Sequence, residues 1–169
     1  MKQLNIIASF GLAAMLAFAC ENQKQPVSEA VDEVIFTDQI AYDSLKAQAY
    51  GADAYGMKKY ILAFLYAGPN RDQDSIRAAE LQKAHLLNMG RMADEGKLVL
   101  AGPFLGDGDL RGIYIFNVGT VEEAEALTNT DPAIQAGRLK MELKEWYGSA
   151  ALMAINDLHK TLSSQEMVE

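Results

Sequence analysis

The middle of the chain alternates continuous apolar runs with amphipathic stretches. Residues 60–67 are apolar throughout and are followed by Gly-Pro-Asn, a length and composition that predict a strand buried on both faces. Residues 74–95 carry apolar positions at helical spacing, with Asp74 or Ser75 available as the N-cap and Gly96 as the C-terminal stop. This second stretch therefore predicts a long helix.

The pattern then changes to two short apolar runs joined by a loop rich in glycine and aspartate. Residues 97–101 and 113–118 predict the two strands of a hairpin, because turn-forming residues separate them. Residues 121–129 follow with helical composition, and Thr120 and Glu123 have the spacing of a capping box. A second helix is expected there.

The last third of the chain predicts a short helix, a strand and a terminal helix. Asp131-Pro132 is typical of a helix start, since aspartate caps the first turn and proline fits its first position. Residues 139–144 alternate apolar and charged side chains, which predicts a strand with one solvated face. An amphipathic stretch from residue 149 to about His159 predicts the terminal helix.

The predicted order is β-α-β-β-α-β with an extra C-terminal helix, an α+β chain of the ferredoxin-like, split βαβ type. Two helices cover only one face of such a sheet, whereas the first strand is apolar on both. The pattern therefore indicates a homodimer in which a second copy covers the free face. The competing cover is the terminal helix or the segment 34–55.

The first residues of the chain predict a targeting signal. Residues 1–19 combine a lysine near the start with a long apolar run, and Cys20 follows a small residue, as in a secretory signal. The end of this run resembles a bacterial lipobox, although Ala17 stands where leucine is usual. The resemblance implies acylation of Cys20 and a lipid anchor in the bacterial cell envelope, periplasmic or on the outer surface. The alternative is an ordinary signal peptide with an incidental cysteine.

The remaining boundaries follow from composition. Residues 20–55 are expected to form a tether, because their first part is polar and contains one proline, with a short helix near 43–49. Residues 56–148 are expected to form the α+β domain, and residues 149–169 the C-terminal helix and tail.

Composition and charge narrow the partners. The chain has 169 residues, half of them hydrophobic, and a formal net charge of −8. A chain this acidic lacks the basic face that phosphate backbones require, so nucleic acid is disfavoured. The two histidines are far apart and no cysteine remains beyond Cys20, so we expect neither a metal centre nor a bound cofactor.

Two side chains are candidates for acid/base chemistry. His85 lies on the apolar stripe of the first long helix, and imidazole exchanges protons near neutral pH; a buried boundary histidine is the simpler interpretation. Asp131 precedes Pro132, and a plain helix cap is the simpler interpretation there.

Three short motifs in this order resemble the YCII-related family of dimeric α+β barrels. They are His85-Leu86, Ala101-Gly102-Pro103-Phe104 and Thr130-Asp131-Pro132, and the resemblance covers roughly residues 55–147. It implies that His85 and Asp131 share one cavity as catalytic residues, and that the chain forms a dimer. Related barrels include lactone isomerases and dehalogenating enzymes.

The split βαβ order gives a geometric expectation for this pair. His85 and Asp131 both belong to the helical layer, so their side chains should lie within direct or water-bridged hydrogen-bond reach. A carboxylate would orient the imidazole, as in a hydrolase triad. Because a pocket side chain packs less tightly than a core one, His85→Ala should cost little stability.

Four further residues are candidate ligand contacts. Gly102 and Pro103 end a strand, where glycine lets a ligand or a helix approach closely; a structural strand stop is the alternative. Arg111 and Tyr114 flank the returning strand of the hairpin. Arg111 could bind a carboxylate, although an exposed hairpin arginine is the simpler interpretation.

Three functions remain open on the sequence. The first is an enzyme that uses His85 and Asp131 to isomerise, eliminate from or hydrolyse a small organic substrate. The second is a non-catalytic module that binds a small ligand at a membrane surface. The third is an envelope interaction protein with a vestigial pocket.

Overall fold

A computed structural model describes residues 41–165, in which the chain from Tyr42 onward forms one compact unit. The predicted signal segment 1–19, the lipidation site Cys20 and the polar tether 21–33 lie outside the described residues. None of the described helices has the length and apolar character that a membrane-spanning helix needs.

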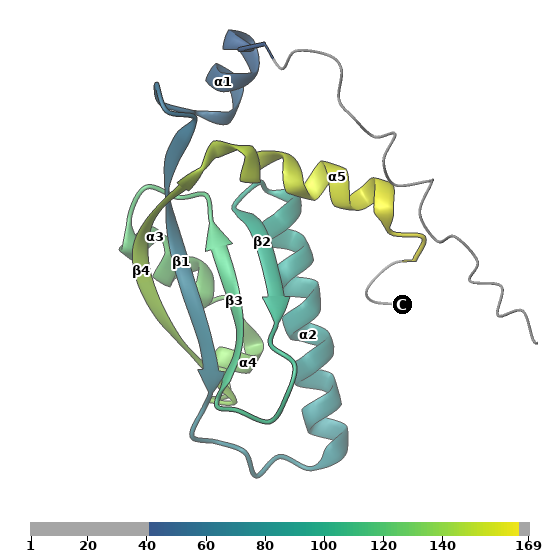
Figure 1. The fold of residues 1–169 in the computed structure, drawn as a ribbon. Helices are drawn as coiled ribbons and strands as arrows, with labels where there is room; N and C mark the ends of the chain where they lie inside the picture. Colours follow the sequence, from purple (N-terminus) through teal and green to yellow (C-terminus); the bar gives the residue numbers. More distant parts are fainter. Residues whose placement is uncertain (1–40, 166–169) are drawn as a thin grey trace, which may run out of the picture. The chain divides into compact units, whose positions relative to one another are not determined.

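The core of this unit is a four-stranded antiparallel sheet in the order β2-β3-β1-β4 (Figure 1). Its strands are β1 (Met57–Ala67), β2 (Leu98–Pro103), β3 (Leu110–Phe116) and β4 (Leu139–Ser149). Strand β1 lies between β3 and β4, so the two halves of the βαββαβ order interleave. The predicted ferredoxin-like fold is confirmed.

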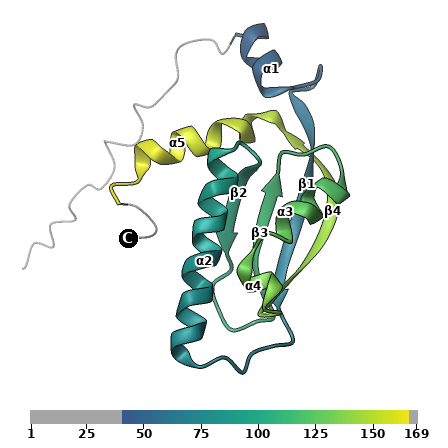
Figure 2. The ribbon, with the colours of Figure 1, turned by 180° about the vertical axis from the view of Figure 1, so that it is seen from behind.

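Three helices cover one face of the sheet (Figure 2). They are α2 (Ser75–Asp94), α3 (Val121–Thr128) and α4 (Pro132–Gln135). Each begins at the cap that the sequence predicts, since Asp74, Thr120 and Asp131 each accept a hydrogen bond from a backbone N–H two or three residues on. The predicted C-terminal stop of α2, Gly96, has the left-handed φ of +67°.

The main core lies between the sheet and these helices. Ile61, Ala63 and Leu65 of β1 point to the helices and pack with Phe116 of β3 and Met92 of α2. From β4, alternate residues beginning at Leu139 join the same core. The charged residues between them are exposed, so the predicted solvated face of this strand is confirmed.

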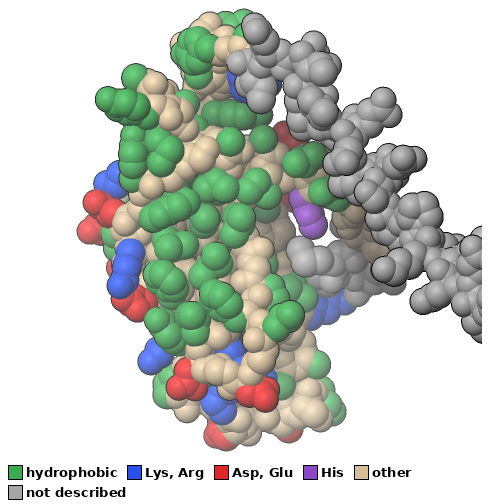
Figure 3. All heavy atoms as spheres, in the orientation of Figure 1, with side chains coloured by type: hydrophobic (Ala, Val, Ile, Leu, Met, Phe, Trp, Pro, Cys, Tyr) green, Lys and Arg blue, Asp and Glu red, His purple; other side chains and the backbone are tan. Residues whose placement is uncertain are grey.

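The other face of the sheet is covered only in part. The short 3-10 segment η1 (Ala150–Ala154) and helix α5 (Ile155–Leu162) lie against one end of it, where Tyr60 is buried. Leu62 and Phe64 of β1 are only half-buried, so the described residues of one chain do not fully bury this face, and its cover by a second copy stays a prediction. Figure 3 shows hydrophobic side chains gathered on this face.

The ends of the unit differ slightly from the pattern. A short helix, α1 (Ser44–Tyr50), occupies the predicted segment and ends at Gly51, whose φ is +68°. Strand β4 continues five residues beyond the alternating stretch because it pairs with β1 as far as Met57↔Ser149. The predicted terminal helix is therefore divided into η1 and α5. Strand pairing over the full length of β1, rather than local pattern, sets this boundary.

Candidate functional site

A cavity of about 330 Å³ opens between α2, the ends of β2 and β3, and the start of β4. This volume is at the small end of the range for ligand pockets. Its lining includes His85 and all four predicted ligand contacts, namely Gly102, Pro103, Arg111 and Tyr114. The structure thus brings the predicted residues together, while their roles toward a ligand stay predictions.

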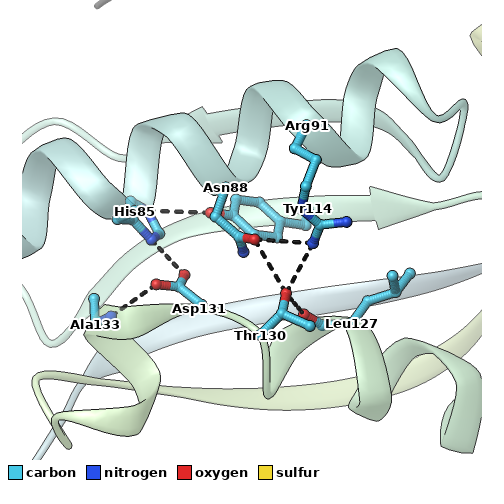
Figure 4. A network of polar contacts seen from close by, with 8 residues as sticks. All are labelled: His85, Asn88, Arg91, Tyr114, Leu127, Thr130, Asp131 and Ala133. Carbon is cyan, nitrogen blue, oxygen red and sulfur yellow. Dashed lines mark hydrogen bonds and ion pairs between the residues drawn. The ribbon is translucent and has the colours of Figure 1, made fainter.

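His85 and Asp131 are in direct contact, although 46 positions separate them in the chain (Figure 4). The Nδ1 atom of His85 lies 2.5 Å from Oδ2 of Asp131, and both side chains are buried. The predicted proximity of the two side chains is confirmed. Buried charge is tolerated only when it is paired, so each side chain is the partner that makes the burial of the other possible.

Asp131 has two structural tasks at once. Its Oδ1 atom accepts a hydrogen bond of 2.8 Å from the backbone N–H of Ala133, which caps α4, while Oδ2 faces His85. The cap fixes the carboxylate plane before any ligand arrives. The helix-cap interpretation and the paired-carboxylate interpretation therefore hold together.

Tyr114 completes the row of polar groups. Its Oη atom lies 3.1 Å from Nε2 of His85, and its side chain comes from the middle of β3. Burial, and then the negative charge of Asp131, hold the pKa of Tyr114 well above its usual range. The hydroxyl therefore keeps its proton. In the tautomer of His85 whose Nδ1–H donates to Asp131, this hydroxyl donates to Nε2.

A second polar bridge holds the same two elements together beside the His85–Asp131 pair. Asn88 and Arg91, one and two turns further along α2, reach Thr130. Arg91 donates from Nη2 to Oδ1 of Asn88 at 2.9 Å and to Oγ1 of Thr130 at 3.0 Å, and Thr130 in turn donates to the carbonyl of Leu127 at 2.7 Å. The bridge fixes the backbone immediately before Asp131.

Arg111 is not the exposed hairpin arginine of the simpler interpretation. Strand β3 pairs Gly112 with Leu65 and Leu110 with Tyr66, so Arg111 is the extra residue of a β-bulge. Regular alternation would place its side chain on the open face, with Ile113. A bulge redirects the side chain, and Arg111 is half-buried and lines the cavity.

Two glycines near Arg111, Gly112 and Gly102, differ in how closely other atoms approach them. A Cβ at Gly112 would lie 2.6 Å from the carbonyl oxygen of Gly102, so the strands approach closely there. A Cβ at Gly102 would meet no atom within 4 Å. Of the alternatives that the sequence leaves open at Gly102, close approach of a helix is therefore not observed, and the space on that side is free.

Two arginines of the cavity lining escape prediction from sequence. Arg71 follows the end of β1 and Arg138 precedes β4; they meet because those two strand ends are neighbours. Gly68 donates its N–H to the carbonyl of Arg138 at 2.8 Å, and a Cβ on Gly68 would collide with the carbonyl oxygen of Gly137. The only local signal for the approach of Arg71 to Arg138 is a glycine within a few residues before each of them, Gly68 and Gly137.

Metal binding finds no support in this part of the chain. No group of three or more His, Cys, Asp or Glu side chains within residues 41–165 is arranged to hold an ion. The cavity lining itself offers an imidazole, a phenol and three guanidinium groups, and the carboxylate of Asp131 lies behind the imidazole.

Comparison with known proteins identifies a family and one structural likeness. The model of the YCII-related domain matches residues 60–147, slightly more than half of the chain. No curated protein matches. One similar solved structure is 5-chloro-2-hydroxyhydroquinone dehydrochlorinase (TftG) from Burkholderia phenoliruptrix AC1100, in complex with 2,5-dihydroxybenzoquinone. It is 22% identical, with a TM-score of 0.38, over 50% of this chain and 92% of that chain; a likeness at this level does not extend to activity.

Proposed function

Since this chain belongs to the YCII-related domain family, we propose that its cavity binds a small organic molecule and that His85 and Asp131 transfer protons to and from it. The observation that carries this proposal is the buried contact between Nδ1 of His85 and the carboxylate of Asp131, with His85 also lining the cavity. Isomerisation, elimination and hydrolysis all begin with such a transfer.

The three side chains have distinct roles in this proposal. Asp131 accepts Nδ1–H and so leaves the lone pair on Nε2, the nitrogen that takes a proton from the ligand. Asp131 also stabilises the imidazolium that this step creates. The hydroxyl of Tyr114, which keeps its proton, donates a hydrogen bond to negative charge that develops on a ligand oxygen.

The test is a screen for proton exchange. The protein is incubated in heavy water with lactones, hydroxylated aromatics and halogenated aromatics, and exchange or conversion is followed by proton NMR. Turnover that the wild type catalyses and a His85 variant does not would support the proposal. Equal rates for the two proteins would contradict it.

A ligand-binding module without catalysis is the second candidate. It is favoured because both ring nitrogens of His85 already have partners, Asp131 on Nδ1 and Tyr114 on Nε2. A ligand must displace the Tyr114 hydroxyl to reach Nε2. Saturable binding without exchange in any compound of the screen would select this candidate.

We propose that a second copy of the chain covers the open face of the sheet. Support comes from Leu62, Phe64 and Ile113, which are apolar and only half-buried there, and from Trp146, which is 37% exposed beside them on β4. Burial of such a face is the usual driving force of a symmetric dimer.

A substitution on the open face is therefore expected to separate the dimer. Phe64→Lys replaces an apolar ring of the proposed interface with a second cation beside Lys144, whose Nζ lies 5.9 Å from the centre of that ring, and should convert a dimer into a monomer in light scattering at micromolar concentration. Leu105→Lys is the control, because Leu105 is 97% exposed on the loop between β2 and β3. A wild type that is monomeric across this range would overturn the proposal.

We also propose that acylated Cys20 anchors the domain in the bacterial envelope. The support is the apolar run of residues 1–19 that ends at the only cysteine of the chain. Cys20→Ser should move the protein from the membrane to the soluble fraction. Mass spectrometry of the wild type should show lipid on Cys20; a wild type without lipid mass in the soluble fraction would contradict the anchor.

A further inference from the structure

The cavity beside His85 is cationic in a chain that is acidic overall. The sequence has 15 lysines and arginines against 23 aspartates and glutamates. Among the described residues that line the cavity, however, the ionic side chains are Arg71, Arg111 and Arg138, with no carboxylate among them. Like charges that gather in one place repel one another, so this arrangement points to an anion that compensates them.

The side chain of Arg111 has one buried hydrogen-bond donor, Nε–H, without an acceptor among the described residues. A buried donor of a charged group that lacks an acceptor is costly. The bulge at Arg111 brings its side chain to the lining of the cavity. The Nε atom itself is shielded from solvent, so a ligand in the cavity is the nearest source of the missing acceptor.

Arg71 and Arg138 are held together by the protein in spite of their charges. Nη1 of Arg71 donates to the carbonyl of Arg138 at 3.2 Å, and Nη1 of Arg138 donates to Oε1 of Gln73 at 2.9 Å. Gln73 is itself fixed, because its amide donates to the carbonyl of Asn70 at 3.0 Å. The guanidinium groups are thus positioned by neutral acceptors.

The charges of these groups also act on one another. Arg71 is exposed, yet slight desolvation, and then the charges of Arg138 and Arg111, lower the pKa of Arg71 from its usual range. None of the three arginines forms an ion pair with a carboxylate in residues 41–165. Other arginines of the same region, Arg77 and Arg91, do have glutamate partners.

We propose that the cavity recognises a small organic carboxylate, whose charged group binds Arg111 and lies near Arg71 and Arg138. The two oxygens of a carboxylate match the planar fork of a guanidinium. The rest of the lining is largely apolar, with Leu65, Met89 and Leu139 among its members, so it suits a compact hydrocarbon body. The inference rests on the proposed function only in taking this cavity as the ligand site.

Benzoate, benzamide and inorganic phosphate are suitable probes, because benzamide has the shape of benzoate without its charge and phosphate has charge without the ring. Binding is followed by thermal unfolding and by the NMR signal of the Arg111 Nε–H. Benzoate should raise the melting temperature with concentration and shift this signal downfield, and benzamide should do neither. Phosphate should bind more weakly than benzoate.

Matched variants test the role of Arg111. Arg111→Gln should weaken benzoate binding about tenfold or more, because it removes a charge-assisted, bidentate contact. Arg111→Lys keeps the charge but loses the fork, so it should recover only part of the affinity. Arg77→Gln is the control, since Arg77 lies exposed on α2 and pairs with Glu80; it should bind like the wild type.

The outcomes separate this inference from the proposed function. Benzoate that binds no better than benzamide, or leaves the Arg111 signal unmoved, would overturn the carboxylate assignment, and phosphate that binds better than benzoate would replace it with a phosphorylated ligand. The variant His85→Asn should still bind benzoate. If this variant binds benzoate and the screen finds no exchange with the wild type, the carboxylate site stands and the catalytic proposal is contradicted. If the wild type catalyses exchange but does not bind benzoate, the catalytic proposal stands and the carboxylate site is contradicted.

Discussion

Replacing His85 with asparagine is expected to slow turnover in the cavity by about 10²–10⁴-fold, the range by which a positioned acid or base accelerates a reaction. Asparagine keeps a side-chain N–H near the position of Nδ1, so Asp131 retains a donor. It removes Nε2, the nitrogen that the carboxylate leaves for the ligand. The loss should therefore appear in kcat, while KM changes little because the arginines that bind the ligand are intact.

The control for this experiment is the other histidine. His159 is exposed on α5, and His159→Asn should leave turnover unchanged. Steady-state kinetics on any compound converted in the exchange screen gives the comparison. If His85→Asn retained wild-type kcat, His85 would be a buried structural histidine and the cavity a binding site.

The alanine variant at the same position answers a different question. His85→Ala would leave the buried carboxylate of Asp131 without its partner, and a buried charge that loses its partner is strongly destabilising. The sequence-based expectation that this change costs little stability does not take that burial into account. Asparagine is therefore the better probe of catalysis.

Asp131→Ala is expected to lower the free energy of unfolding by about 2–4 kcal/mol. About 1 kcal/mol comes from the lost cap at the N-terminus of α4, because Oδ1 no longer accepts from Ala133. A further loss of about 1–3 kcal/mol comes from the buried N–H of His85, which is left without an acceptor. Urea unfolding at pH 7 measures the sum.

A second capping aspartate separates these two contributions. Asp74 caps α2 through one hydrogen bond to Arg77 and is exposed, so Asp74→Ala should cost only about 1 kcal/mol. Asp131→Asn should lie between the two alanine variants, because its oxygen keeps the cap on Ala133 while its NH2 group replaces the oxygen that faces Nδ1 of His85. An Asp131→Ala variant no less stable than Asp74→Ala would mean that the buried pair contributes nothing.

The local sequence pattern was sufficient to predict the helices and strands, and to locate His85 and Asp131 in the site. Helix α2 begins at Asp74 and ends before Gly96 as expected, because caps and left-handed glycines act within one or two turns. The same short-range logic located Asp131 at a helix start. The order of strands and helices then left few sheet topologies, and that is why the contact of His85 with Asp131 could be anticipated.

Other features required the folded chain. The apolar run of β1 does not reveal which segments cover its second face; the folded chain shows that η1 and α5 lie against only one end of it. The length of β4 depends on its partner strand, because β4 pairs with β1 as far as Met57↔Ser149, beyond the stretch that alternates.

The cationic character of the cavity depended most on tertiary structure. Arg71 and Arg138 lie in two separate loops and Arg111 lies in strand β3, and no local pattern relates the three. Arg111 reaches the cavity because strand pairing forces a bulge at that residue, whereas Arg71 and Arg138 meet because the backbones at Gly68 and Gly137 touch. The sequence by itself determined the elements and the His85–Asp131 pair; the pairing of distant strands decided the charge around them, because only backbone contacts between remote segments set where those side chains point.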